Sequence, residues 1–218
     1  PWRETGDDLL IEAVGGQRIV DIDASFLIER GFLVHPEIHF INVPTMKKPG
    51  GTYSEVYKNY IEKNSTRNML IIEATKQLVD MGRKVLILVT KVDHGKTLLQ
   101  NLSSDLRVAS LDGRNSTVDR LENIGKMKNG ELDVLIASKI FDQGVDIPNL
   151  DALVLAGSGK SGARALQRIG RVIRKNEGKD RAIVVDFKDN CKYLRNHSKA
   201  RYKIYKTERL FEIKVQSE

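Results

Sequence analysis

Short apolar segments alternate with helix-like segments along most of the chain, and this alternation restricts the fold more than any other feature. The apolar segments are rich in Val, Ile and Leu and lack the polar alternation of a half-exposed strand. They cover residues 84–89, 107–110, 132–137, 152–156 and 181–187. Strands of this kind are buried on both faces, as in parallel sheets whose crossovers are helices. We therefore expect an α/β fold, a parallel sheet flanked by helices on both faces.

A turn-rich segment interrupts the chain before this alternation begins. Residues 44–51 contain two prolines and two glycines, and we place a domain boundary there. The preceding residues combine two short helical segments, 6–14 and 25–30, with a strand over 37–43. They look like the edge of another domain. The expected division is 1–45 for this edge and its linker, 46–190 for the α/β domain, and 191–218 for a basic helical tail.

Positive charge is concentrated near the end of the chain. The whole sequence has 36 Lys and Arg against 29 Asp and Glu, a net charge of +7. Residues 188–209 contain eight basic and two acidic side chains, whereas residues 1–30 have a local net charge of −4. A basic cluster of this kind suits phosphate contact with a nucleic acid, because it displaces counterions from the backbone. The alternative is a solvated helix face.

Several classes of protein are excluded by composition. No apolar run approaches the roughly 18 residues that a membrane-spanning helix requires, so we expect no membrane partner. The single cysteine, Cys191, cannot form an internal disulfide, and no signal peptide is recognisable. We therefore expect an intracellular location: the cytoplasm, with a nucleoid or a viral replication site as alternatives. His35 and His39 are separated by Pro36 and are read as strand residues, so we expect no metal site of the protein's own.

Two loops resemble phosphate-binding loops but depart from the full pattern. The first is 90–97, which ends in Gly95, Lys96 and Thr97, and the second is 157–161. Both follow a strand, yet Thr90 and Val154 stand where the pattern G-x-x-x-x-G-K-[ST] requires its first glycine. An autonomous P-loop nucleotide enzyme therefore remains an alternative. The other explanation is that the glycines serve tight turns between strands and helices.

The helix expected over 162–174 has a polar face that contains two arginines. Gln167, Gly170, Arg171 and Arg174 have helical spacing, and Leu166, Ile169 and Ile173 fall on the opposite side. Guanidinium groups match phosphate oxygens and can stabilise charge that develops during phosphoryl transfer. Spacing alone equally allows a salt-bridged surface helix.

The order of these segments resembles superfamily 2 helicases. Residues 137–148 are similar to their motif V, and 167–174 to motif VI, at the expected separation. Residues 85–90 resemble motif IV, and 111–113 followed by Arg120 resemble the small motif between IV and V. The start of the chain and the ending Val172, Ile173 and Arg174 are similar to the DNA-directed branch that contains the UvsW and XPB-like helicases.

This resemblance implies that most of the chain is a second RecA-like domain. It is preceded by the last part of a first RecA-like domain, the rest of which is absent from the sequence. In the family, Arg171 and Arg174 would be arginine fingers toward ATP and Mg²⁺ held mainly by the first domain. Gln167, Gly144 and Asp146 would line the nucleotide side. The nucleic-acid backbone would be contacted by Thr90, Gly113 and Ser138.

The resemblance thus predicts the motor half of an ATP-dependent helicase that acts on single-stranded or branched DNA, with RNA as an alternative. No complete P-loop and no Asp-Glu-x-x box occur in the sequence. We therefore expect the chain alone to be inactive in ATP hydrolysis. The competing hypotheses are the autonomous P-loop enzyme and a basic nucleic-acid-binding module without a role for ATP.

Overall fold

A computed structural model describes residues 13–16, 19, 22–44, 51–138, 150–157, 159, 161–176 and 178–216. The strands within these residues are β1 (His35–Asn42), β2 (Val85–Leu88), β3 (Val108–Leu111), β4 (Val134–Ala137), β5 (Ala152–Val154), β6 (Arg181–Lys188) and β7 (Glu212–Val215). They form one seven-stranded sheet in the order β3-β4-β2-β5-β6-β1-β7, and every neighbouring pair is parallel. The parallel sheet expected from the apolar segments is confirmed.

Helices connect the strands. The described helices are α2 (Ala24–Glu29), α3 (Tyr53–Tyr57), a π-helical turn η1 (Lys58–Glu62), α4 (Ser65–Asp80), α5 (Val92–Leu102), α6 (Thr117–Lys128), α7 (Gly162–Val172) and α8 (Leu194–Tyr205). Local sequence explains where several begin: the side chains of Asn64, Ser116 and Ser161 each accept a hydrogen bond from a backbone N–H of the first helical turn. None of the described helices is both long and apolar enough to cross a membrane.

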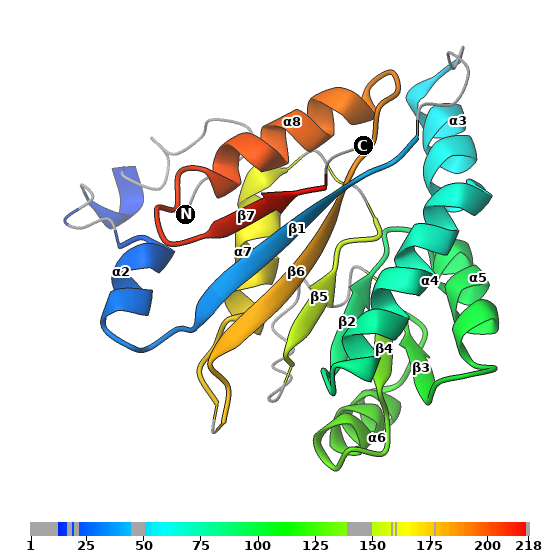
Figure 1. Ribbon diagram of the computed structural model, residues 1–218, viewed down its shortest axis with the longest axis horizontal. Coiled ribbons are helices and arrows are strands. Elements are labelled where there is room, and N and C mark those ends of the chain that lie inside the picture. The colour runs from blue at the N-terminus through cyan, green and yellow to red at the C-terminus, as the bar shows by residue number, and fades with distance from the viewer. Residues whose placement is uncertain are drawn as a thin grey trace.

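Alternate residues of the strands face two separate cores. Leu86 and Leu88 of β2 belong to a core that includes buried residues of α6, α7 and α8. Val85 and Ile87 belong to the other core, which includes residues of α4 and α5. Figure 1 shows the same layers, with α4 and α5 on one side of the sheet and α7 on the other. The helices therefore cover both faces, as the buried character of the strands predicts.

Strand β1 lies inside the sheet rather than in a separate domain. His35–Asn42 pairs with β6 along its length, and its other edge pairs with β7. The expected boundary at 45/46 therefore does not separate residues 35–42 from the α/β domain. Strand β7 was not expected at all, because Glu212–Val215 alternates polar and apolar residues over only four positions. It forms an edge strand within the segment that we expected to be a helical tail.

Candidate functional site

The three expected nucleic-acid contacts lie along one edge of the sheet. Thr90 follows β2, Gly113 follows β3 and Ser138 follows β4, and these strands are parallel neighbours. The backbone N–H of Ser138 donates to the carbonyl of Leu111 over 3.1 Å, which ties the ends of β4 and β3 together. Gly113 is exposed, Thr90 is half-buried and Ser138 is buried. Ligands of parallel α/β sheets bind at this carboxyl edge.

Thr90 is joined to the loop that follows β5. Its hydroxyl donates to the carbonyl oxygen of Gly157 over 2.9 Å, and the hydroxyl of Tyr57 donates to the same oxygen over 2.7 Å. A Cβ atom on Gly157 would lie 2.6 Å from Thr90 Oγ1 and 2.8 Å from its backbone nitrogen. Burial raises the pKa of Tyr57 to about 12, so its hydroxyl remains a hydrogen-bond donor at neutral pH. Only glycine allows this approach of the two strand ends.

Two buried arginines hold the same loop by its carbonyl groups. Arg67 of α4 donates to Asp189 over 2.8 Å and to the carbonyl of Ala156 over 2.8 Å. Arg201 of α8 donates to the carboxylate of Asp186 and, over 2.7 Å, to the carbonyl of Gly159. The loop between β5 and α7 is thus fixed by side chains from both layers of helices.

The two loops that resemble phosphate loops have structural uses. A Cβ atom on Gly95 would lie 3.3 Å from Val89 Cγ2 and 3.4 Å from Ile136 Cγ2, so this glycine lets α5 pack closely on the sheet. Lys96 pairs with Asp93, and Thr97 donates to the carbonyl of Asp93. In the second loop Gly157 has the close contact described above, while Ser158 and Lys160 lie outside the described residues.

Helix α7 has the two faces that its sequence predicts. Ala165, Ile169 and Val172 are at most 3% exposed and pack into the core, as does Ile173 at the end of the helix. On the other face Gln167 is exposed, and Gly170 and Arg171 are half-buried. The helix ends at Val172 rather than at residue 174, so the exposed Arg174 lies beyond it, in an isolated antiparallel bridge with Leu33. The helix contains no acidic residue. This face therefore suits a group that carries several negative charges, such as a triphosphate.

Two expected nucleotide contacts, Gly144 and Asp146, lie outside the described residues, as do most of the segment that resembles motif V and the first residues of the chain. The structure brings together Thr90, Gly113 and Ser138 at one edge of the sheet. It places Gln167 and Arg171 on one face of α7, and Arg174 two residues beyond the end of that helix.

A groove beside Thr90 involves residues that the sequence did not single out. It has a volume of about 580 Å³ and is lined by Tyr53, Ser54, Tyr57, Lys58, Glu62, Thr90, Lys91, Val92 and Asp93. Its wall is α3 and the π-helical turn η1, and such turns occur frequently at functional sites. The sequence features that could have indicated this groove are local. Thr52 and Glu55 form a capping box that starts α3, and Tyr53 and Tyr57 are one helical turn apart.

Other chemistry-bearing residues are structural. His35 and His39 lie in β1, as expected for strand residues. Among the described residues, no three His, Cys, Asp or Glu side chains are grouped so as to hold a metal ion. Cys191 is buried, and this burial raises the pKa of its thiol to about 11, which makes it a poor nucleophile at neutral pH.

The seven-stranded parallel sheet with helices on both faces is the architecture of a RecA-like helicase domain. Residues 56–176 match the family described as "Helicase conserved C-terminal domain". The chain belongs to this family, the C-terminal RecA-like domains of superfamily 2 helicases.

Individual relatives agree with this assignment. The "ATP-dependent DNA helicase uvsW" of Enterobacteria phage T4 is 32% identical over 185 residues, which are 81% of this chain and 36% of that protein. The crystal structure of T4 UvsW superposes with a TM-score of 0.67 at 28% identity, covering 84% of this chain and 41% of that one. Saccharomyces cerevisiae Dbp5 bound to RNA and ADP BeF3 shares the fold, with a TM-score of 0.65 at 16% identity, over 99% of this chain and 49% of that one. The chain spans about a third of the length of the first curated relatives that it matches.

Proposed function

We propose that this chain is the C-terminal motor domain of an ATP-dependent DNA helicase or translocase. The observation that carries the proposal is α7, which is anchored by one buried face and carries Arg171 on the other, with Arg174 two residues beyond its end. The similarity to a helicase named as acting on DNA favours DNA as the partner. RNA remains the alternative, because Dbp5 has the same fold and its structure contains RNA.

In this proposal, ATP and Mg²⁺ are held mainly by a first RecA-like domain that belongs to the same working protein. Arg171 and Arg174 orient their guanidinium groups toward the γ-phosphate and stabilise the charge that develops as it is transferred to water. Arginine fingers raise such rates by about 10³ to 10⁵. Gln167, Gly144 and Asp146 complete the nucleotide side. The absence of acidic residues from α7 fits a triphosphate, since no carboxylate of that helix repels it.

The nucleic-acid backbone would lie along the carboxyl edge of β3, β4 and β2. Gly113 presents an open backbone to it, and Thr90 and Ser138 lie beside it at the ends of β2 and β4. Contacts of this kind position a phosphate chain without reading sequence. Because Thr90 is hydrogen-bonded to the loop that leads into α7, a shift at the nucleic acid has a short path to the arginines.

The test compares DNA-stimulated ATP hydrolysis by the 218-residue chain with that of a protein in which it is joined to a first RecA-like domain. We expect turnover only in the two-domain protein. Arg171→Ala and Arg174→Ala should each lower its rate by about 10³-fold or more and leave most of the DNA affinity intact. Arg107→Ala is the matched control, because this exposed arginine pairs with Asp133 at the amino end of β3.

The alternatives predict different results. ATP hydrolysis by the chain alone, abolished by Lys160→Ala, would establish an autonomous P-loop enzyme and overturn the proposal. DNA binding with unchanged hydrolysis in the Arg171→Ala and Arg174→Ala two-domain proteins would instead support a basic binding module.

A further inference from the structure

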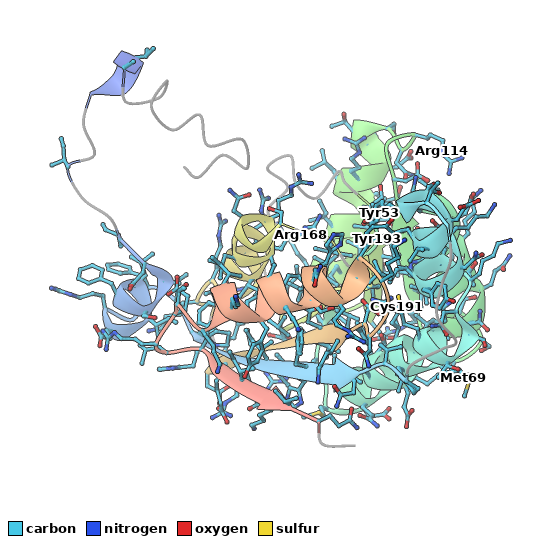
Figure 2. The ribbon with its side chains drawn as sticks, turned by 90° about the horizontal axis from the view of Figure 1, so that it is seen from above. Tyr53, Met69, Arg114, Arg168, Cys191 and Tyr193 are labelled. Atoms are coloured by element: carbon cyan, nitrogen blue, oxygen red, sulfur yellow. The ribbon has the colours of Figure 1, made fainter. Side chains whose placement is uncertain are left out.

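Four aromatic rings from two distant parts of the chain meet beside the groove at Thr90. The ring centroid of Tyr53 lies 6.0 Å from that of Tyr57, 5.9 Å from that of Tyr193 and 5.5 Å from that of His197. Tyr53 and Tyr57 belong to α3, whereas Tyr193 and His197 belong to the start of α8. Figure 2 shows Tyr53 and Tyr193 next to each other. We call these four residues the aromatic cluster.

The cluster remains accessible although its rings are packed together. Tyr57 is buried, but Tyr53 is 43% exposed and Tyr193 and His197 are half-buried. Tyr53 also lines the groove, together with Lys58, Thr90 and Lys91. The central ring of the cluster therefore borders both solvent and the expected path of the nucleic-acid backbone.

The backbone at Tyr193 is strained, and the strain fixes its ring against Tyr53. Tyr193 has φ 60° and ψ −53°, and among the described residues it is the only non-glycine with positive φ. The N–H of Leu194 donates to the carbonyl of Lys192 over 2.6 Å, which closes a three-residue turn of the rare γ type. Cys191 and Leu194 on either side are buried and hold this turn in place. Such strain persists only where surrounding packing imposes it.

The described residues that line the groove carry equal numbers of positive and negative charges. Lys58 and Lys91 line it with Glu62 and Asp93, so electrostatic attraction alone does not explain a ligand there. The groove also contains the exposed ring of Tyr53. Bases of a single strand stack on such rings regardless of sequence. A base that stacks on the ring of Tyr53 must therefore be unpaired.

We propose that the aromatic cluster, with Tyr53 at its centre, is a stacking platform for an unpaired base of a single-stranded nucleic acid whose phosphate lies at Thr90. The inference rests on the proposed function and adds a base-contacting site to its backbone contacts. Single-stranded DNA and single-stranded RNA both offer an unpaired base, so the experiment below distinguishes the two.

The test measures binding of fluorescent oligodeoxythymidine, oligouridine and an abasic oligodeoxynucleotide of equal length to the full 218-residue chain by anisotropy. Tyr53→Leu removes the ring, and we expect it to weaken binding to the oligonucleotides that carry bases by about tenfold. The abasic strand should bind both forms equally. Tyr53→Phe should restore the affinity. Phe26→Leu is the matched control, since Phe26 is 41% exposed on α2 and has Arg30 over its ring at 5.2 Å.

A second readout does not depend on the variant. Photocross-linking of wild-type protein to an oligonucleotide that contains 4-thiothymidine should place the cross-link on Tyr53 or Tyr193 in peptide mass spectra. Wild-type binding that Tyr53→Leu leaves unchanged, or weakens equally for the abasic strand, overturns the platform and spares the proposed function. Absence of any wild-type binding also overturns the platform, whereas the proposed function is decided by ATP hydrolysis in the two-domain protein. The ratio of affinities for deoxythymidine and uridine strands assigns the source of the base.

Discussion

At the residue scale, Gly157 is the point where the backbone after β5 meets the backbone after β2. Its carbonyl accepts from both Thr90 and Tyr57, and the space for a side chain is already occupied by Thr90. This glycine therefore fixes the distance between the groove and the start of α7.

Gly157→Ala should destabilise the protein by about 2 kcal/mol, because its Cβ must displace backbone as well as side-chain atoms. Gly159→Ala is a stringent control: nothing lies within 4 Å of its added Cβ, so we expect a change of about 0.5 kcal/mol or less. Urea unfolding measures both. Equal costs at the two glycines would show that the loop can move away from Thr90.

His94 provides a second prediction at this scale. It is 1% exposed, and its Nε2 is 2.9 Å from Asn68 Oδ1. Burial, with a contribution from the charge of Arg67, lowers its pKa from 6.5 to about 3. The folded protein therefore keeps His94 neutral, whereas the unfolded chain binds a proton below about pH 6.5.

Stability should consequently fall as the pH decreases through this range. Between about pH 7 and about pH 5 the loss assigned to His94 is about 2 kcal/mol. His94→Gln removes the titrating group, so its free energy of unfolding should change less over the same interval. Denaturant titrations at the two pH values check this difference, and parallel curves for the two proteins would contradict it.

At the element scale, two buried ion pairs attach helices to the end of β6. Arg201 of α8 donates to both carboxylate oxygens of Asp186, and the hydroxyl of Tyr205 donates to the same carboxylate over 2.7 Å. On the other side of the sheet, Arg67 of α4 pairs with Asp189. The same arginines hold the loop before α7, so the packing of α4 and α8 also positions the arginine face.

Arg201→Met should cost about 3 to 5 kcal/mol, because it leaves the fully buried Asp186 carboxylate without its cation. Lys126→Met is the comparison: Lys126 pairs with Glu122 on the exposed side of α6, and its loss should cost about 0.5 kcal/mol or less. Thermal and urea unfolding of both variants measure the contrast. Similar costs would mean that the buried pair contributes no more than a surface one.

The sequence predicts these elements unequally well. Strands such as Val85–Leu88 and Val134–Ala137 are continuous apolar runs, and their burial on both faces follows directly. The two faces of α7 also follow from spacing. Strand β7 and the place of β1 do not, because short or mixed strands are decided by their partners in the sheet. The aromatic cluster was equally hidden, since it joins residues 53 and 193 only after folding.

At the scale of the whole molecule, three lysines of the basic segment gather around one groove beside α8. Lys188, Lys199 and Lys203 line a groove of about 320 Å³ together with Phe40, Tyr202 and Val215. None of the described residues that line it is acidic. The basic segment that the sequence singles out is therefore partly gathered around one hollow beside α8.

Binding of single-stranded DNA should consequently depend strongly on salt. If about four phosphates are neutralised, affinity should fall by about 50-fold between about 50 and about 200 mM monovalent salt. Lys199→Ala with Lys203→Ala should reduce the slope of log affinity against log salt, whereas Lys76→Ala, which removes a partner of Asp105 on the exposed surface of α4, should leave it unchanged. Anisotropy titrations at several salt concentrations give the slopes. A slope that the double variant does not alter would exclude this groove from the binding surface.

The position of β1 also determines when this sheet can be completed during synthesis. Its two neighbours are β6 and β7, and its first residue, His35, pairs with Arg181. On a ribosome that adds about 5 to 20 residues per second, β1 leaves the exit tunnel well before its first neighbour has been made, a delay on the order of 10 seconds. During that interval the apolar side chains of Ile38 and Phe40 have no sheet to enter. The nascent chain is therefore most open to chaperones and to aggregation between the synthesis of β1 and that of β6 and β7.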